Sequence, residues 1–158
     1  MKRIVIYIGI LAAVFAAPVR PQNIGKMKPV QVVSVYKEKD WVVVETDTED
    51  RGMGGTTAQA LQNLKDTTSG IVYLDTAEYL LLSKDAEENV EELRRELKPS
   101  VRLCIATRPV DLAETAKFLG VHGGIPKLKH WRKGQELPVL STFGESLIFL
   151  KSLRIVSK

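Results

Sequence analysis

The chain has 158 residues, of which 44% are hydrophobic, and it carries a formal net charge of +4. This length and this apolar fraction suit one domain with one buried core. The single cysteine, Cys104, excludes an internal disulfide framework and a cysteine-rich metal site. Because it lies in the apolar run VRLCIA, we expect it to be a small buried hydrophobic residue.

Charge is distributed unevenly along the chain. Residues 1–36 carry five basic groups and no acidic group, residues 37–96 carry seven basic and fifteen acidic groups, and residues 97–158 carry eleven basic and four acidic groups. This asymmetry predicts a dipolar molecule with a basic C-terminal face.

The N-terminal segment is typical of an export signal. A basic start, MKR, precedes sixteen uncharged residues, 4–19, and VFA at 14–16 fits a small-residue cleavage site. If it is retained, the segment acts as a signal-anchor; a buried N-terminal strand or helix is the alternative. We therefore predict a signal peptide or membrane anchor over residues 1–19, a linker over residues 20–29, and an extracytoplasmic protein that is membrane-anchored or secreted.

Residues 30–120 are predicted to form an α+β domain. Two valine-rich runs, 30–36 and 41–46, flank the polar connection KEKD, as in a β-hairpin. Residues 47–55 are acidic and then glycine-rich, and we expect a mobile loop there. A helix follows, capped by Thr56 or Thr57, with Ala58, Leu61 and Leu64 on one face, and the polar run TSG at 68–70 ends it.

The second half of this domain alternates strands and helices. Residues 71–74 and 78–82 are rich in branched and aromatic side chains, which predicts strands. Asp85 is expected to cap a second helix that ends before Pro99, with an apolar stripe at helical spacing made of Ala86, Val90, Leu93 and Leu97. Residues 101–106 predict another strand, and Asp111 is expected to cap a third helix that ends at Gly120.

This order predicts a small mixed β-sheet with about three helices packed on it. Residues 121–158 form a loop-rich basic tail, punctuated by glycine and proline. The last apolar alternation, residues 147–156, predicts a strand or a hairpin near the C-terminus.

The glycine-rich loop is a candidate anion site. Gly54, Gly55 and Thr56 precede a helix, where free N–H groups and the helix dipole attract phosphate. The loop lacks the lysine of a P-loop, and a flexible connection into the helix is the alternative interpretation.

A second candidate anion site is the densest basic cluster, Lys127, Lys129, Arg132 and Lys133, with Trp131 among them. Three interpretations stay open: a solvated loop whose Trp131 lies in the core, a surface for anionic lipid or polymer, and a nucleic-acid site. Because an exported protein meets lipid and cell-wall polymer more readily, nucleic acid is not among the partners we expect.

The sequence holds no recognisable catalytic constellation. His122 and His130 have no carboxylate or thiol ligand set nearby, and we predict neither metal binding nor general-base work for them. Asp75 is interpreted as part of a turn, and Glu78 as solvent-facing. We therefore expect a non-enzymatic protein with no catalytic residue, no metal and no cofactor.

Apolar patterning over roughly residues 31–118 has a familiar order. Ala60-Leu61 and Leu64 lie in a short helix, Ile71 to Leu74 and Tyr79 to Leu82 in strands, and Arg102 to Ala106 in a later strand. This order resembles the N-terminal domain of the Ger(x)C family, the C-subunits of spore germinant receptors, which are exported lipoproteins. The resemblance implies a structural partner in a membrane receptor complex.

Two departures from that family bear on function. The chain has no lipid-attachment cysteine after its apolar segment, and it is too short to hold the family's further domains. We therefore expect a single-domain relative that serves as a structural or assembly component of a sporulation, germination or envelope complex, with membrane and protein partners. An anion-binding module for a phosphate-bearing polymer or an anionic lipid surface is the alternative.

Overall fold

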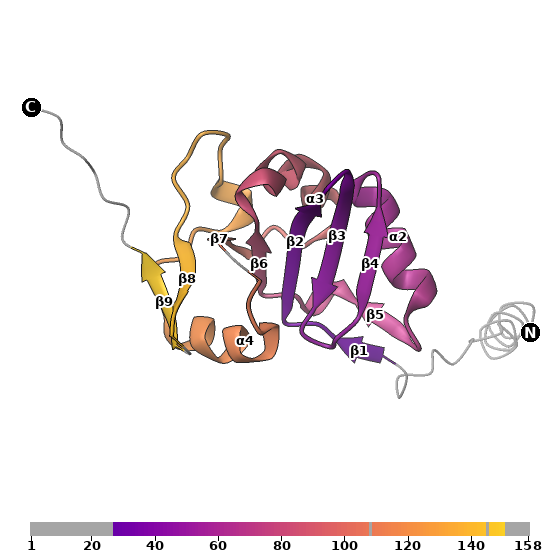
Figure 1. Cartoon of the computed structure of the whole chain (residues 1–158), viewed down its shortest axis with the longest axis horizontal. Coiled ribbons are helices and arrows are strands. Elements are labelled where there is room, and N and C mark those ends of the chain that lie inside the picture. Colours follow the sequence, from indigo (N-terminus) through magenta and orange to yellow (C-terminus); the bar gives the residue numbers. More distant parts are fainter. Residues whose placement is uncertain (1–26, 108, 145, 151–158) are drawn as a thin grey trace, which may run out of the picture.

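The computed structural model describes residues 27–107, 109–144 and 146–150. The predicted signal or anchor, residues 1–19, lies outside the described residues, as do residues 20–26 of the predicted linker. The described chain is a mixed α+β fold, in which a seven-stranded sheet carries three α-helices (Figure 1). The predicted fold class is confirmed.

The large sheet has the spatial order β4-β3-β2-β6-β7-β8-β9. Its strands are β2 (Val32–Glu38), β3 (Trp41–Thr46), β4 (Arg51–Gly54), β6 (Tyr79–Leu82), β7 (Arg102–Ala106), β8 (Val139–Phe143) and β9 (Ser146–Leu150). The four central strands β2, β6, β7 and β8 are parallel, and β3, β4 and β9 add antiparallel pairs at the two edges. The predicted hairpin is β2–β3.

The helices are α2 (Thr57–Thr67), α3 (Val90–Glu96) and α4 (Leu112–Val121), with short 3-10 helices η2 (Leu74–Thr76), η3 (Lys84–Asn89) and η4 (Leu128–His130). In Figure 1, α2 lies at the β4 end of the sheet and α4 toward the β8–β9 end. None of the described helices has the length and apolar character that crossing a membrane requires.

The expected mobile loop at residues 47–55 is wrong for its second half, because Arg51–Gly54 forms the edge strand β4. Its glycines let α2 approach closely. A Cβ atom added to Gly52 would lie 2.2 Å from the carbonyl oxygen of Ala60, and one added to Gly54 would lie 2.5 Å from the Ala60 nitrogen. The glycines therefore serve helix–strand packing.

The predicted cap of α2 is confirmed at Thr56, whose hydroxyl accepts a hydrogen bond from the backbone N–H of Gln59 (3.2 Å). The predicted buried face is wrong at Ala58, which is exposed. The buried residues are Thr57, Ala60, Leu61 and Leu64. The i, i+3 spacing fixes a face only to within about a third of a turn, and contact with β4 selects Ala60 in place of Ala58.

Part of the expected linker is structured. Met27–Pro29 forms β1, which pairs in parallel with β5 (Ile71–Tyr73) in a separate two-stranded sheet. The backbone N–H of Val30 donates to the Thr76 hydroxyl, and that hydroxyl donates to Val30 O (2.9 Å each). These hydrogen bonds hold the end of β1 beside η2.

The predicted second helix divides into η3 and α3. Asp85 does not cap it, because η3 begins before it at Lys84 and no side chain makes the cap hydrogen bond. The predicted stripe is nonetheless confirmed, since Ala86, Val90, Leu93 and Leu97 are all buried.

The third helix begins as predicted, where Asp111 accepts a hydrogen bond from the backbone N–H of Glu114 (2.8 Å). The loop-rich segment that follows extends the large sheet. The backbone N–H of Leu103 donates to Pro126 O (2.9 Å), and that of Leu128 donates to Val101 O (2.7 Å). The chain then forms the β8–β9 hairpin, whose second strand covers the start of the predicted 147–156 alternation; residues 151–156 lie outside the described residues.

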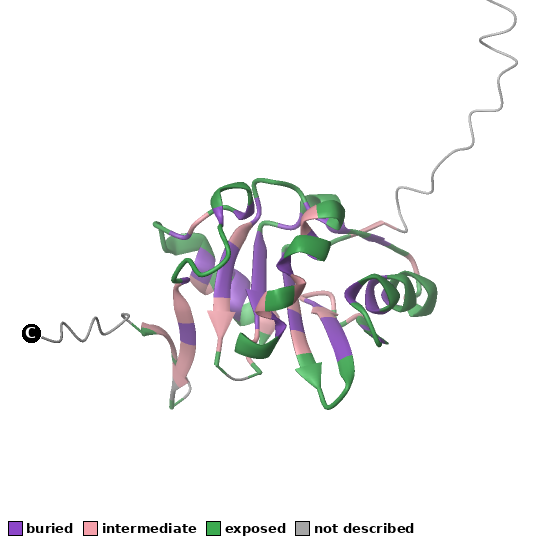
Figure 2. Cartoon of the chain, turned by 90° about the horizontal axis from the view of Figure 1, so that it is seen from above, coloured by how far each residue is buried: buried purple, intermediate pink, exposed green. Residues whose placement is uncertain are grey.

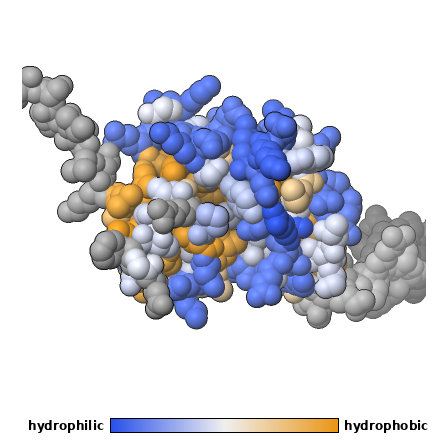
Figure 3. Space-filling view, in the orientation of Figure 1, coloured by the Kyte–Doolittle hydropathy of each residue, from blue (hydrophilic) through white to orange (hydrophobic). Residues whose placement is uncertain are grey.

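Two hydrophobic clusters occupy the two faces of the sheet. Figure 2 shows the buried residues concentrated in the central strands and on the sheet-facing sides of the helices. One cluster, which we call the α4-face cluster, joins β2, β6, β7 and β8 to Ala116 and Leu119 of α4. Figure 3 shows hydrophobic residues gathered over the part of the molecule where β6, β8 and β9 lie.

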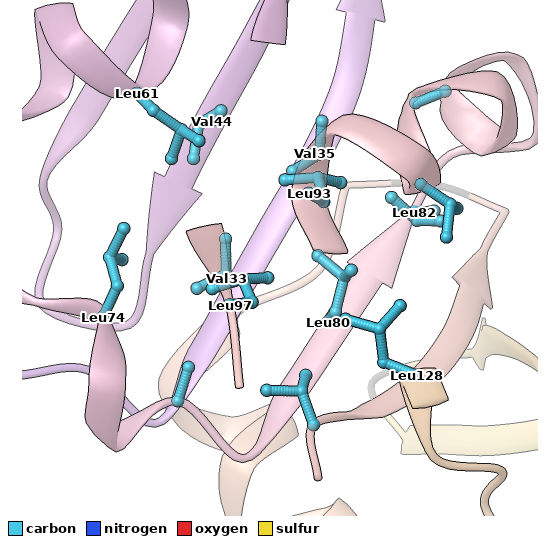
Figure 4. Close-up of a cluster of buried hydrophobic side chains, with 14 of the residues drawn as sticks. Val33, Val35, Val44, Leu61, Leu74, Leu80, Leu82, Leu93, Leu97 and Leu128 are labelled. Carbon is cyan, nitrogen blue, oxygen red and sulfur yellow. The ribbon is translucent and has the colours of Figure 1, made fainter. Parts of the chain in front are cut away.

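The other cluster is larger and joins the sheet to α2, η3, α3 and η4. Figure 4 shows Leu61 of α2 beside Val44 of β3, and Leu93 of α3 beside Val35 of β2. Leu128 and Trp131 bring the segment after α4 into this cluster. One face of the sheet is thus covered by α2 and α3, whereas α4 covers only part of the opposite face.

Candidate functional site

A cleft lies at the carboxyl ends of the parallel strands β2, β6 and β7, the place where open α/β sheets commonly bind ligands. It consists of two pockets on opposite faces of the sheet, of about 700 Å³ and about 480 Å³, which we call the larger and the smaller chamber. Both are lined by Ser83, Ala106 and Thr107, which follow or end β6 and β7. We call the two together the carboxyl-end cleft.

The larger chamber has an apolar floor and a polar rim. The floor is formed by Ile105, Ala106, Leu137 and Val139, and the rim by Ser83, Lys84, Asp85, Glu87, Thr107, Gly134, Gln135 and Glu136. Carboxylates outnumber ammonium groups on this rim. The chamber therefore favours a ligand that is apolar on one side and carries positive charge on the other.

Ser83 has unused hydrogen-bonding capacity in this cleft. Its backbone N–H donates to Val35 O (3.0 Å), whereas its hydroxyl oxygen is shielded from solvent and has no hydrogen-bond partner among the described residues. The neighbouring Thr107 hydroxyl donates to Ser141 Oγ (3.0 Å). A buried polar group without a partner is costly, and because this hydroxyl is shielded from solvent, a ligand atom reaches it only if the Ser83 side chain rotates toward the cleft.

The smaller chamber is bordered by a polar network on β2, β3 and β4. The Tyr36 hydroxyl donates to Glu45 Oε1 (2.7 Å), and Arg51 pairs with both Glu45 (3.3 Å) and Glu38 (2.7 Å). Ser34, Lys37, Pro109 and Val110 complete the lining. Because its charges pair with one another, this network holds the chamber wall in place more than it attracts an ion.

Tyr36 gives this network a measurable signature. Burial, and then the hydrogen bond to Glu45, raise the pKa of Tyr36 from 10.0 to about 12. We expect Glu45→Gln to lower the pKa of Tyr36, but not fully to its ordinary value, because the burial remains. Ultraviolet difference absorbance of tyrosinate, with Tyr36→Phe subtracted to isolate this residue, measures the change.

The raised pKa of Tyr36 also makes the free energy of unfolding depend on pH in the alkaline range. The folded-state pKa lies above the unfolded one, so the contribution of Tyr36 is complete below the unfolded value and is lost as pH rises through the folded value of about 12. An unchanged tyrosinate transition in Glu45→Gln would contradict the role assigned to Glu45.

The predicted anion residues of the glycine loop lie elsewhere, at the start of α2. Gly54 belongs to β4, while the N–H of Gly55 donates to Gln59 Oε1 (3.0 Å). Gly55 and Thr56 line a separate pocket of about 300 Å³ with Lys37, Lys39, Asp40, Val42, Glu88, Asn89 and Glu92. Lys37 is paired with Glu88 there, so an anion in this pocket would meet carboxylates.

The predicted basic cluster lies around η4, and it does not line that pocket. Lys127, Lys129, Arg132 and Lys133 are exposed, whereas Trp131 is only 3% exposed and joins the core. The guanidinium of Arg94 lies over the indole, 5.4 Å from its centroid, and donates to the backbone oxygens of Leu128 and Trp131. The tryptophan thus lies in the core, as in the first of the three interpretations, and the four basic side chains around it are exposed.

The two histidines lie apart from the carboxyl-end cleft. His122 stacks on Phe118, with ring centroids 4.1 Å apart, and His130 ends η4. The described residues contain no group of three or more His, Cys, Asp or Glu side chains arranged to hold a metal ion. Asp75 lies in η2, as part of the predicted turn, and Glu78 is exposed.

Cys104 is fully buried in β7, and burial raises its thiol pKa from 9.0 to about 12. Because the thiolate is the reactive form, we expect the folded chain to resist alkylation at mildly alkaline pH. Iodoacetamide labelling followed by mass spectrometry tests this, with the same chain in denaturant as the control. Labelling of the folded chain as fast as the denatured one would contradict the buried position.

No protein-family model, no curated protein and no solved structure matches the chain.

The residues of the carboxyl-end cleft were missed by the sequence analysis. A usable signal was present, because Ser83 follows the apolar run YLLL and Thr107 follows LCIA, and polar residues directly after parallel strands meet at one sheet edge. Recognising it required knowing that β6 and β7 are parallel neighbours.

Proposed function

We propose that this protein is a non-enzymatic, extracytoplasmic binding module that holds a segment of a partner protein in the carboxyl-end cleft. The observation that supports the proposal is the shape and chemistry of the larger chamber. It combines an apolar floor with a polar rim on which carboxylates outnumber ammonium groups. Most protein ligand sites share this combination of apolar walls and a few polar groups that fix orientation.

The chamber's rim favours a basic partner segment. The side-chain carboxylates of Asp85 and Glu87 have neither a hydrogen bond nor an ion pair with another residue of the described chain. A lysine or arginine of the partner can pair with them while a neighbouring apolar side chain rests on Ile105 and Leu137.

The setting of this proposal comes from the sequence. The export-like segment at residues 1–19 and the resemblance to the Ger(x)C family support a partner in an envelope, sporulation or germination complex. In that setting the protein is a structural or assembly component, and its chemistry is recognition.

Site-specific photo-cross-linking in the native host tests the proposal. A photoreactive residue replaces Gln135 in the larger chamber of the full chain, and a matched variant carries it at Gln62, an exposed position on α2. We expect a partner to be captured at position 135 and not at 62. Asp85→Lys combined with Glu87→Lys should reduce the capture, and added salt should reduce it as well.

His122→Ala and His130→Ala serve as controls for an enzymatic role, and we expect both to leave capture unchanged. The proposal fails if position 135 captures nothing beyond what position 62 captures, or if the charge reversal has no effect.

A further inference from the structure

The two edges of the large sheet differ in how they are protected. At the β4 edge, α2 reaches over the strand, and its Asn63 side chain accepts a hydrogen bond from the backbone N–H of Met53 (3.0 Å). Thr67 of the same helix donates to Arg51 O (3.5 Å). A helix and charged side chains thus occupy this edge, which is how natural sheets prevent strand addition.

The β9 edge has no such protection among the described residues. β9 pairs only with β8, and its five residues, SLIFL, contain no charge, no proline and no glycine. In an antiparallel pair, alternate residues direct their N–H and C=O groups away from the neighbouring strand. Within the described part of the chain, β9 therefore presents unpaired main-chain groups on a neutral strand that is largely apolar.

Both faces of β9 are apolar apart from Ser146, which is exposed at the start of the strand. Leu147 and Phe149 belong to the α4-face cluster, where Phe149 contacts Phe118 (5.4 Å between centroids) and His122 (5.6 Å). Ile148 and Leu150 lie on the opposite face by strand alternation, and Leu150 is 45% exposed. On the helix beside this patch, Val121 is 81% exposed.

We infer that β9 is the interface through which two copies of this chain associate, by antiparallel β9–β9 pairing that joins their sheets. The strand is suited to its own copy because it carries no charge, so self-apposition brings no like charges together. With the twofold axis at Ile148, Leu147 of one copy faces Phe149 of the other, and the two Ile148 side chains face each other. The same patch occupies both sides of such an interface, as twofold symmetry requires.

Light scattering coupled to size exclusion, on the full chain in mild detergent, tests this inference. We expect the chain to be a dimer. Ile148→Lys places two like charges opposite each other and should raise the dimer dissociation constant at least about tenfold. Met53→Lys, the matched change on the protected β4 edge, should leave the dimer intact.

Two further variants keep the test decisive. If circular dichroism shows that Ile148→Lys is unfolded, Leu150→Lys at the more exposed position replaces it, with the same expected loss of the dimer. Ile148→Cys should form a disulfide between copies under oxidation, since Cys104, the other cysteine, is buried. A monomeric wild-type chain, a dimer that survives the lysine variants, or a dimer that Met53→Lys disrupts equally would overturn the inference.

Discussion

Trp131→Ala is expected to lower the free energy of unfolding by about 3–5 kcal/mol, the range typical of a truncated buried tryptophan. Trp131 is 3% exposed and packs in the cluster that joins α3 to the sheet. The change also removes the aromatic ring beneath Arg94. Urea unfolding followed by circular dichroism measures the loss, because fluorescence would change with the missing indole itself.

Trp41 provides the matched control. It begins β3 and is 53% exposed, so Trp41→Ala should change the free energy of unfolding by no more than about 1 kcal/mol. A loss at Trp131 as small as that at Trp41 would contradict the buried position. The ring inside the basic cluster would then be available to stack on a ligand.

Gly52→Ala is the second large effect, and we expect it to cost about 3 kcal/mol. The added Cβ would lie 2.2 Å from Ala60 O and 2.5 Å from Leu64 N. Both neighbours are backbone atoms of α2, so no side-chain rotation relieves the clash. The helix has to move away from β4, which loosens the packing of Leu61 and Leu64. Denaturant unfolding and thermal melting measure the loss.

Gly120→Ala makes the same change where space is open. Gly120 lies in the last turn of α4, and an added Cβ would meet no atom within 4 Å. Alanine favours a helix over glycine, so we expect a gain of about 0.5 kcal/mol. If Gly52→Ala is as well tolerated as Gly120→Ala, then α2 does not lie on β4 as described.

Prediction from sequence succeeded where a few neighbouring residues decide the outcome. The stripe Ala86, Val90, Leu93 and Leu97 is buried, and Asp111 caps α4, because side-chain spacing and capping geometry are local properties. It failed at β4, since the run RGMG has no apolar alternation and becomes a strand only by pairing with β3 and packing against α2. It failed similarly at Ala58, where the neighbouring element selects which side of the helix is buried.

Prediction of the candidate site was limited in the same way, because it could use only local features of the sequence. The sequence directed attention to Gly54, Gly55 and Thr56 and to the Lys127–Lys133 cluster, because local motifs and charge density stand out in a linear chain. In the structure the first group packs and caps α2, and the second surrounds a buried tryptophan. Ser83 and Thr107 carry no motif, and they meet only because β6 and β7 are parallel neighbours.

By itself, the sequence determined the α+β class, the β2–β3 hairpin, the approximate positions of the helices, the buried stripe from Ala86 to Leu97, and the burial of Cys104. Those features depend on periodicity and on local hydrogen bonding, which a chain carries in any context. Only the tertiary structure decided the strand order, the carboxyl-end cleft and the contrast between the β4 and β9 edges. These depend on which distant segments pair, and that choice is made by the burial of whole faces against one another.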